Sequence, residues 1–123
     1  MITREQIEKA KKEVILKGNG HHQHDDCIRI AYEWLDAQKK TKNPRNVPDT
    51  LKHLIERWAG RYVSQSDVEI AAHLHPKITG DYPYYNISSR LTEPSVDRLK
   101  NIAQAFTQGQ REQHQVNDYS VKE

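Results

Sequence analysis

The apolar positions recur at helical spacing in three early segments of the chain, roughly 3–17, 25–40 and 48–60. Thr3 and Gln6 form a capping-box pattern before the first segment, and Asp25 and Asp26 can cap the second. The apolar faces are Ile7, Ala10 and Val14; Ile28, Ala31, Trp34 and Leu35; and Leu51, Leu54, Ile55 and Trp58. This pattern predicts an N-terminal helical hairpin followed by a third helix, which Pro48 begins and Gly60 ends.

The stretch 62–91 has the outline of a helix-turn-helix. Ser64 can cap a fourth helix, with Asp67 three residues later, and Pro83 opens a fifth helix that ends before Pro94. A sixth helix is predicted from there to Gly109. The connection 76–82 is longer than a tight helix-turn-helix turn, which leaves either a variant with a stretched turn or a plain helical bundle.

The predicted fold is therefore all-α: a single small helical domain of about six helices with a helix-turn-helix-like C-terminal half. Residues 1–43 would form the hairpin, 44–109 the helical core and 110–123 a disordered tail with too little apolar surface to offset the entropy of ordering it. No alternation at period two is long enough to predict a regular strand, although 61–63 and 82–85 could make short extended pieces.

The predicted fifth helix has two chemically different sides. Tyr84, Ile87 and Leu91 make an apolar side for packing, and the opposite side carries groups that can contact bases, since Asn pairs with adenine and Arg with guanine. The predicted base contacts are Tyr85, Asn86, Ser88, Ser89 and Arg90, and the predicted phosphate contacts are Lys77, Arg57, Arg61 and Arg98. The partner expected on this basis is double-stranded DNA.

The overall charge gives this interpretation little support. Nineteen Lys and Arg against seventeen Asp and Glu leave a formal net charge of +2, so nucleic-acid binding must depend on a local patch. The single cysteine, Cys27, excludes an intrachain disulfide and favours a reducing, cytoplasmic compartment. No run approaches the roughly 18 apolar residues of a membrane span, so no membrane partner is expected.

The stretch 21–27 crowds three histidines, two aspartates and Cys27 into seven residues, all of them side chains that bind transition metals. Structural zinc sites draw two ligands from each of two separated segments, and no second pair is visible. The preferred interpretation is a loop whose aspartates cap the second helix, so neither a metal site nor a cofactor is predicted. No phosphate-cradling glycine loop or nucleophile motif is present, and the protein is not expected to be an enzyme.

The helical hairpin, the run from Asp26 to Leu35 (DCIRIAYEWL) and the helix-turn-helix-like half together resemble small accessory proteins from the early regions of temperate phages and other bacterial mobile elements. The resemblance covers about residues 3–107, implies a bacterial or phage cytoplasmic setting, and carries over no functional residue. Such proteins include both DNA-binding regulators and inhibitors of host enzymes.

The expected function is therefore that of a small DNA-binding regulatory protein of phage or plasmid type. The alternative is a non-enzymatic accessory factor that binds or inhibits a host protein, which an exposed cluster of Tyr82, Tyr84 and Tyr85 would also suit. The same tyrosines would equally suit base stacking on a single strand. The sequence is also compatible with a homodimer.

Overall fold

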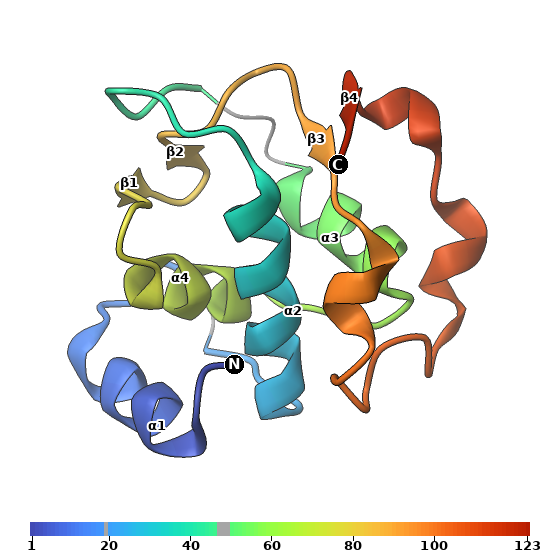
Figure 1. The fold of residues 1–123 in the computed structure, drawn as a ribbon. Coiled ribbons are helices and arrows are strands. Elements are labelled where there is room, and N and C mark those ends of the chain that lie inside the picture. Colours follow the sequence, from blue (N-terminus) through green and yellow to red (C-terminus); the bar gives the residue numbers. More distant parts are fainter. Residues whose placement is uncertain (19, 47–49) are drawn as a thin grey trace.

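The computed structural model describes residues 1–18, 20–46 and 50–123. Within these ranges lie four α-helices, α1 (Arg4–Glu13), α2 (Asp25–Ala37), α3 (Leu51–Ala59) and α4 (Gln65–Leu74) (Figure 1). Two small sheets join β1 (Gly80–Asp81) antiparallel to β2 (Tyr84–Tyr85), and β3 (Thr92–Glu93) parallel to β4 (Val121–Lys122). Three 3-10 helices complete this part of the chain: η1 (Val96–Leu99), η2 (Gly109–Gln113) and η3 (Val116–Asp118).

The first four predicted helices are present, and local capping explains their ends. A capping box formed by Thr3 and Gln6 begins α1, and a second one formed by Ser64 and Asp67 begins α4. Gly60 ends α3 in the left-handed conformation, with φ of 60°, which a residue without a side chain adopts at little cost.

The start of α2 differs from the prediction. Its N-cap is His24, whose ring Nδ1 accepts a hydrogen bond from the Asp26 backbone amide at 2.9 Å, and both aspartates lie inside the first turn. In the first turn, their negative charges still interact favourably with the positive end of the helix dipole. Pro48, predicted in the first turn of the third helix, lies outside the described residues.

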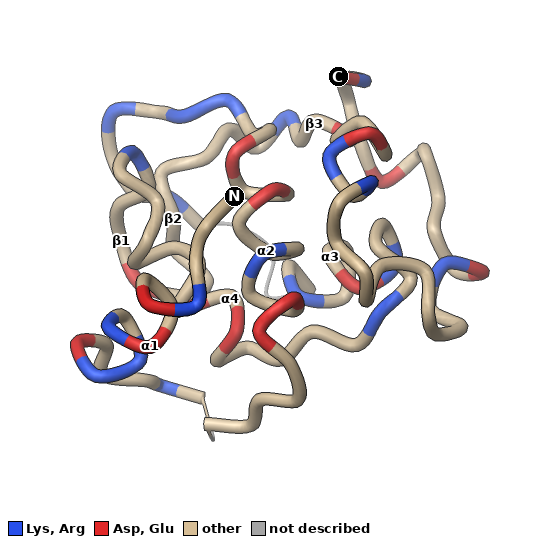
Figure 2. Tube along the Cα trace, turned by 60° about the horizontal axis from the view of Figure 1, so that its bottom comes forward, with Lys and Arg blue, Asp and Glu red and all other residues tan. Residues whose placement is uncertain are grey.

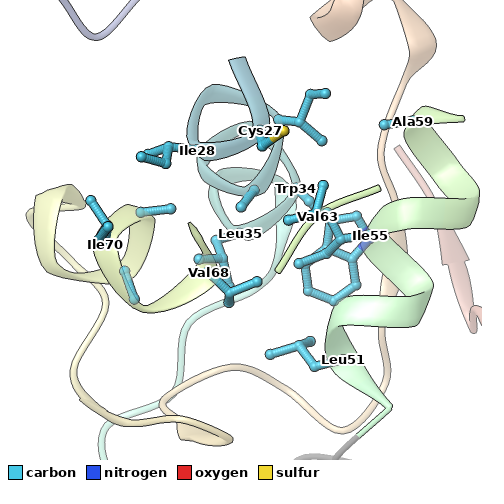
Figure 3. Packing of buried hydrophobic residues seen from close by; sticks show 14 of the residues in the cluster. Cys27, Ile28, Trp34, Leu35, Leu51, Ile55, Ala59, Val63, Val68 and Ile70 are labelled. Carbon is cyan, nitrogen blue, oxygen red and sulfur yellow. The ribbon is translucent and has the colours of Figure 1, made fainter. Parts of the chain in front are cut away.

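One hydrophobic cluster joins α2, α3 and α4, and α1 packs against α4. Trp34 and Trp58 are both fully buried in it, and the Trp58 indole N–H donates to the Pro94 carbonyl at 3.0 Å. Figure 3 shows side chains from all three helices, among them Trp34, Ile55 and Val68, converging on a common interior. The cluster takes residues from both 1–43 and 44–109.

The all-α prediction with six helices is wrong, beginning with the fifth helix. Residues 80–85 form the β1–β2 hairpin around a cis Tyr82–Pro83 peptide bond. Tyr85, Asn86 and Ile87 are 2%, 5% and 0% exposed, whereas Tyr84, on the predicted apolar side, is 53% exposed. This burial does not match the apolar face predicted for a helix, and the segment is held instead by strand pairing, of β2 with β1 and of Ile87 with Lys40.

The predicted sixth helix is also wrong, because only η1 forms after Pro94. The chain then turns back onto the end of α3, where Phe106 N donates to the Ala59 carbonyl at 2.7 Å and Gln108 N to the Gly60 carbonyl at 3.0 Å. These bonds satisfy carbonyls that a helix end leaves without partners. η1 ends at Leu99, and Phe106 has a positive φ of 62°, a conformation that does not occur within a right-handed helix.

The prediction of a disordered tail over 110–123 is wrong as well. Two 3-10 helices and β4 lie in this stretch, and η2 packs along α3 (Figure 1). The Trp34 indole N–H donates to the Tyr119 hydroxyl at 2.9 Å, and His114 Nε2 lies 2.6 Å from a Glu93 carboxylate oxygen. Hydrogen bonds to buried partners thus order a segment with few apolar residues.

Arg98 connects Glu123 to α2 through hydrogen-bonded ion pairs. Its guanidinium donates to Glu33 and Asp36 at 3.0 and 2.9 Å and to Glu123 at 2.6 and 2.8 Å. The hydrogen bond from Arg98 lowers the pKa of Glu123 from its ordinary 4.5, against the opposing effect of burial. Burial raises the pKa of Asp36, but hydrogen bonds from His75 and Arg98 outweigh it, and the net pKa is lowered.

We expect this attachment to weaken in acid. A pKa lowered by folding contributes stability above the unfolded value, and that contribution is lost as pH falls through the folded value. Urea midpoints measured between pH 7 and 2.5 should therefore fall below about pH 4.5. Arg98→Gln should flatten this dependence, and an unchanged pH profile in that variant would show that the cluster does not contribute.

Candidate nucleic-acid interface

The connection between α2 and α3 lies antiparallel beside the segment that follows β2. Residues 39–45 and 85–88 are joined through an isolated bridge between Lys40 and Ile87. Their backbone hydrogen bonds run from Ser88 N to Lys39 O and from Thr41 N to Asn86 O, both at 2.8 Å, and from Arg45 N to Tyr85 O at 3.2 Å. Two stretches whose bonded residues are 40 to 49 positions apart in sequence thus form one surface.

Asn86 holds this surface to the loop after α4. Its Nδ2 donates to the Thr41 carbonyl at 3.3 Å and to the Lys77 carbonyl at 2.9 Å, and its Oδ1 accepts from Thr79 N at 2.7 Å. The residue is 5% exposed. Because its amide is used within the fold, Asn86 positions the neighbouring backbone and has no free edge for a base.

His75 fixes the same loop from its other side. Its Nδ1 accepts from the Lys77 backbone amide at 3.1 Å, so Nε2 carries the proton that faces Asp36 at 2.8 Å. His75 is buried and also ends α4 as its C-cap. The Lys77 backbone is therefore held by both His75 and Asn86, which fixes its position next to the 39–45 and 85–88 segments.

Five exposed cations gather on these adjoining segments, and we refer to them together as the basic surface: Lys39, Lys42, Arg45, Lys77 and Arg90. None of them forms an ion pair with a carboxylate in the part of the chain that the structure describes. Figure 2 shows basic positions along the α2–α3 connection at the top left of the molecule. Arg90 follows the 85–88 segment in the chain, and its backbone amide donates to Ser88 Oγ at 3.1 Å.

Lys40 lies among these cations but is already used. Its Nζ donates to the carbonyls of Leu35 and Asp36 at 3.1 and 2.6 Å, where it neutralises the end of α2. Burial lowers the pKa of Lys40, against the opposing effect of the nearby Asp36 carboxylate. Lys40 is therefore not counted among the cations that are free to contact a partner.

The predicted site residues divide into two groups. Lys77, Ser89 and Arg90 are exposed and Ser88 is half-buried, and all four lie on the segments of the basic surface. Tyr85, Asn86 and Arg61 are buried, and Arg98 is held by three carboxylates. Arg57 is half-buried on α3. The predicted helical face of base contacts does not exist, because the helix that would carry it is absent.

Three members of the basic surface were missed in the sequence: Lys39, Lys42 and Arg45. The signal was present, because four of the seven residues 39–45 are basic. The helix predicted over 25–40 includes Lys39 and Lys40, and the predicted boundary between 1–43 and 44–109 divides the rest of the run. The structure ends α2 at Ala37, which places the whole run in an exposed connection.

The 21–27 loop contacts the start of α4. His22 faces carboxylates through both ring nitrogens, Nδ1 at 2.6 Å from Asp67 and Nε2 at 3.0 Å from Asp25. Cys27 is buried, and burial raises its pKa to about 11. Among the described residues, no group of three or more His, Cys, Asp and Glu side chains is arranged to hold a metal ion.

No family model, curated protein or solved structure that was compared matches this chain. The described residues contain no helix that is both long and apolar enough to cross a membrane.

Proposed function

We propose that this protein binds double-stranded DNA by contacting the phosphate backbone with its basic surface. The observation that carries the proposal is the gathering of five exposed cations, none paired with a carboxylate of the described residues, on adjoining segments of a chain whose formal net charge is only +2. Phosphate contacts by Lys and Arg supply nearly all of non-specific DNA affinity, because each contact releases condensed counterions. A local patch of this kind can therefore support DNA binding although the net charge of the whole chain is too small to do so.

The surface also offers hydroxyl donors. Ser88 is half-buried and Ser89 is exposed between the cations, and serine hydroxyls commonly donate to phosphate oxygens. The backbone at this position is irregular and provides no helix for the major groove. We therefore propose backbone contacts with little sequence preference, in place of base reading by a helix.

A duplex suits this surface better than a single strand. Single-strand binding uses aromatic side chains as platforms on which successive bases stack. Of the three tyrosines near the surface, Tyr85 is 2% exposed and Tyr82 is half-buried, which leaves Tyr84 at 53%. One exposed ring provides a single stacking position, whereas five cations provide five phosphate contacts.

The proposal predicts a steep salt dependence. Titration of a fluorescent 20-base-pair duplex of random sequence should give a Kd of roughly 10⁻⁶–10⁻⁴ M at physiological salt. With five phosphate contacts, log K should fall against log salt with a slope of about −4 to −5, since each contact contributes about −0.9. A slope near zero, or no binding at the highest protein concentration, would contradict the proposal.

The alternative function, binding to a host protein, predicts a different outcome of the same experiment. An acidic protein surface would also be attracted to the five cations, and the protein would then be a non-enzymatic accessory factor. Absence of duplex binding together with a stoichiometric protein complex would favour that function. The absence of enzymatic activity, the regulatory role and the cytoplasmic location stay predictions.

A further inference from the structure

A cleft of about 390 Å³ opens between the chain that follows α1, the helix α4 and the β1–β2 hairpin. Figure 1 shows α1, α4 and β1 on the same side of the molecule. Its apolar walls are Val14, Ile15, Ala72, Ile78, Tyr82 and Tyr85. The volume falls in the range of small-ligand sites, which combine apolar walls with a few fixed polar groups.

Glu69 supplies a fixed negative charge to the cleft. It lines the cavity although the residue is only 8% exposed. Its two carboxylate oxygens accept from the backbone amides of Lys17 and Gly18 at 2.8 and 3.0 Å, and Gln65 Nε2 donates to it at 3.0 Å. All three donors are neutral groups, and no cationic side chain among the described residues forms an ion pair with Glu69.

The other carboxylates around the cleft are exposed. Asp81 lies 3.8 Å from Lys17 Nζ, and Glu13 lies 3.2 Å from His73 Nε2, a contact that pairs opposite charges only when the ring is protonated. Glu69 is therefore the buried carboxylate of the cavity, and no described side chain of opposite charge pairs with it. Burial in a low-dielectric position makes such a carboxylate attract a cation more strongly than an exposed one does.

The Tyr85 hydroxyl is a second polar group directed to the same space. The side chain is 2% exposed and lines the cleft, and its hydroxyl makes no hydrogen bond within the described chain. Among the described residues, the one fully enclosed side-chain polar atom without a partner is Gln110 Oε1, so the Tyr85 hydroxyl keeps access to the cavity. Burial raises the pKa of Tyr85, with a further contribution from the charge of Glu69.

We propose that this cleft binds an organic monocation, an alkylammonium or guanidinium group whose charge lies against Glu69 and whose alkyl chain lies along the apolar walls. The Tyr85 hydroxyl would orient the charged end as a hydrogen-bond partner. The same chemistry belongs to a free small amine and to a lysine or arginine side chain of a polypeptide. This site is separate from the basic surface, so its failure would leave the proposed DNA binding untouched.

The direct test compares charged and neutral probes of equal size. Amide NMR spectra are recorded while n-butylammonium or n-butanol is added to the intact protein. We expect the amine to shift Lys17, Gly18 and residues around Glu69 and to bind about tenfold or more tightly than the alcohol, because hydrogen bonds to charged groups are the stronger ones. Equal binding of both probes, or shifts confined to other regions, would overturn the proposal.

Two variants locate the interaction. Glu69→Gln should weaken n-butylammonium binding about tenfold, and Tyr85→Phe should weaken it a few-fold while the alcohol is unaffected. Glu5→Gln, on the exposed face of α1, is the matched control and should bind like the wild type. If Glu69→Gln does not fold, as thermal melting would show, the comparison of amine with alcohol on the wild type still decides.

A second arm separates the two sources of the cation. Acetyl-Ala-Lys-Ala-amide presents the same ammonium group on a peptide backbone. Tighter binding of this peptide than of n-butylammonium would assign the cleft to a polypeptide partner, and tighter binding of the free amine would assign it to a small molecule. Failure of both to bind would overturn the proposal.

Discussion

Trp58→Ala is expected to lower the free energy of unfolding by about 3–5 kcal/mol, which is the usual cost of deleting a fully buried tryptophan. The Trp58 side chain is 0% exposed and lies in the cluster that joins α2, α3 and α4. Its loss leaves a cavity among rigid helices and also leaves the Pro94 carbonyl without its 3.0 Å donor. The penalty therefore has both an apolar and a polar part.

Urea denaturation at neutral pH measures this cost. Val96→Ala, at a residue 47% exposed, is the control and should change stability by less than about 0.5 kcal/mol. Trp58→Phe should lie between the two, because it keeps most of the volume and loses the indole N–H. A Trp58→Ala protein as stable as the wild type would mean that the α3 packing described above is incorrect.

Replacing three cations of the basic surface together should nearly abolish DNA binding. Lys39, Lys42 and Arg45 lie on one exposed connection and form no ion pair with a described carboxylate, so changing all three to Gln should leave the fold intact. With three phosphate contacts removed, affinity at 0.1 M salt should fall on the order of 10²–10³-fold, because each contact contributes about −0.9 to the salt exponent.

The matched control removes the same charge elsewhere. Lys9, Lys12 and Lys100 are exposed and lie on other elements, and their triple Gln variant has the same net charge as the first. It should retain most of the affinity, since only long-range attraction changes. Equal losses in the two variants would show that overall charge governs binding and that the basic surface is not the contact site.

The parts of the fold that sequence predicted well are those set by neighbouring residues. The capping boxes of Thr3 with Gln6 and of Ser64 with Asp67 involve residues three apart, and both helix starts were found. Gly60 ended α3 for an equally local reason. In each case the backbone conformation follows from a few adjacent side chains, whatever the rest of the chain does.

The errors fall where distant segments decide the outcome. The residues Tyr84, Ile87 and Leu91 are compatible with a helix, and the strand-like alternative wins because 85–88 pairs with 39–45. The tail is ordered by partners such as Trp34, which lies 85 positions from Tyr119. The composition of a short segment indicates neither the distant strand it pairs with nor the distant side chains that order it.

The candidate interface was predictable only in part for the same reason. Lys77 and Arg90 were recognised, but their assigned partners were residues of a helix that does not form. The basic run in 39–45 could be read from the sequence alone. Its meeting with Lys77 depends on the hydrogen bonds of Asn86 to both segments, which only the tertiary structure shows.

Amide chemical-shift mapping with a random DNA duplex tests the central proposal most directly, because it locates the contact surface as well as detecting binding. Increments of a 12-base-pair duplex are added to the isotope-labelled protein at low salt. We predict that the largest shifts fall at 39–45, at Lys77 and at 88–90, and that they disappear at 0.5 M salt. Shifts concentrated on α1 or on η2, or no shifts at all, would contradict the proposal that the basic surface binds DNA.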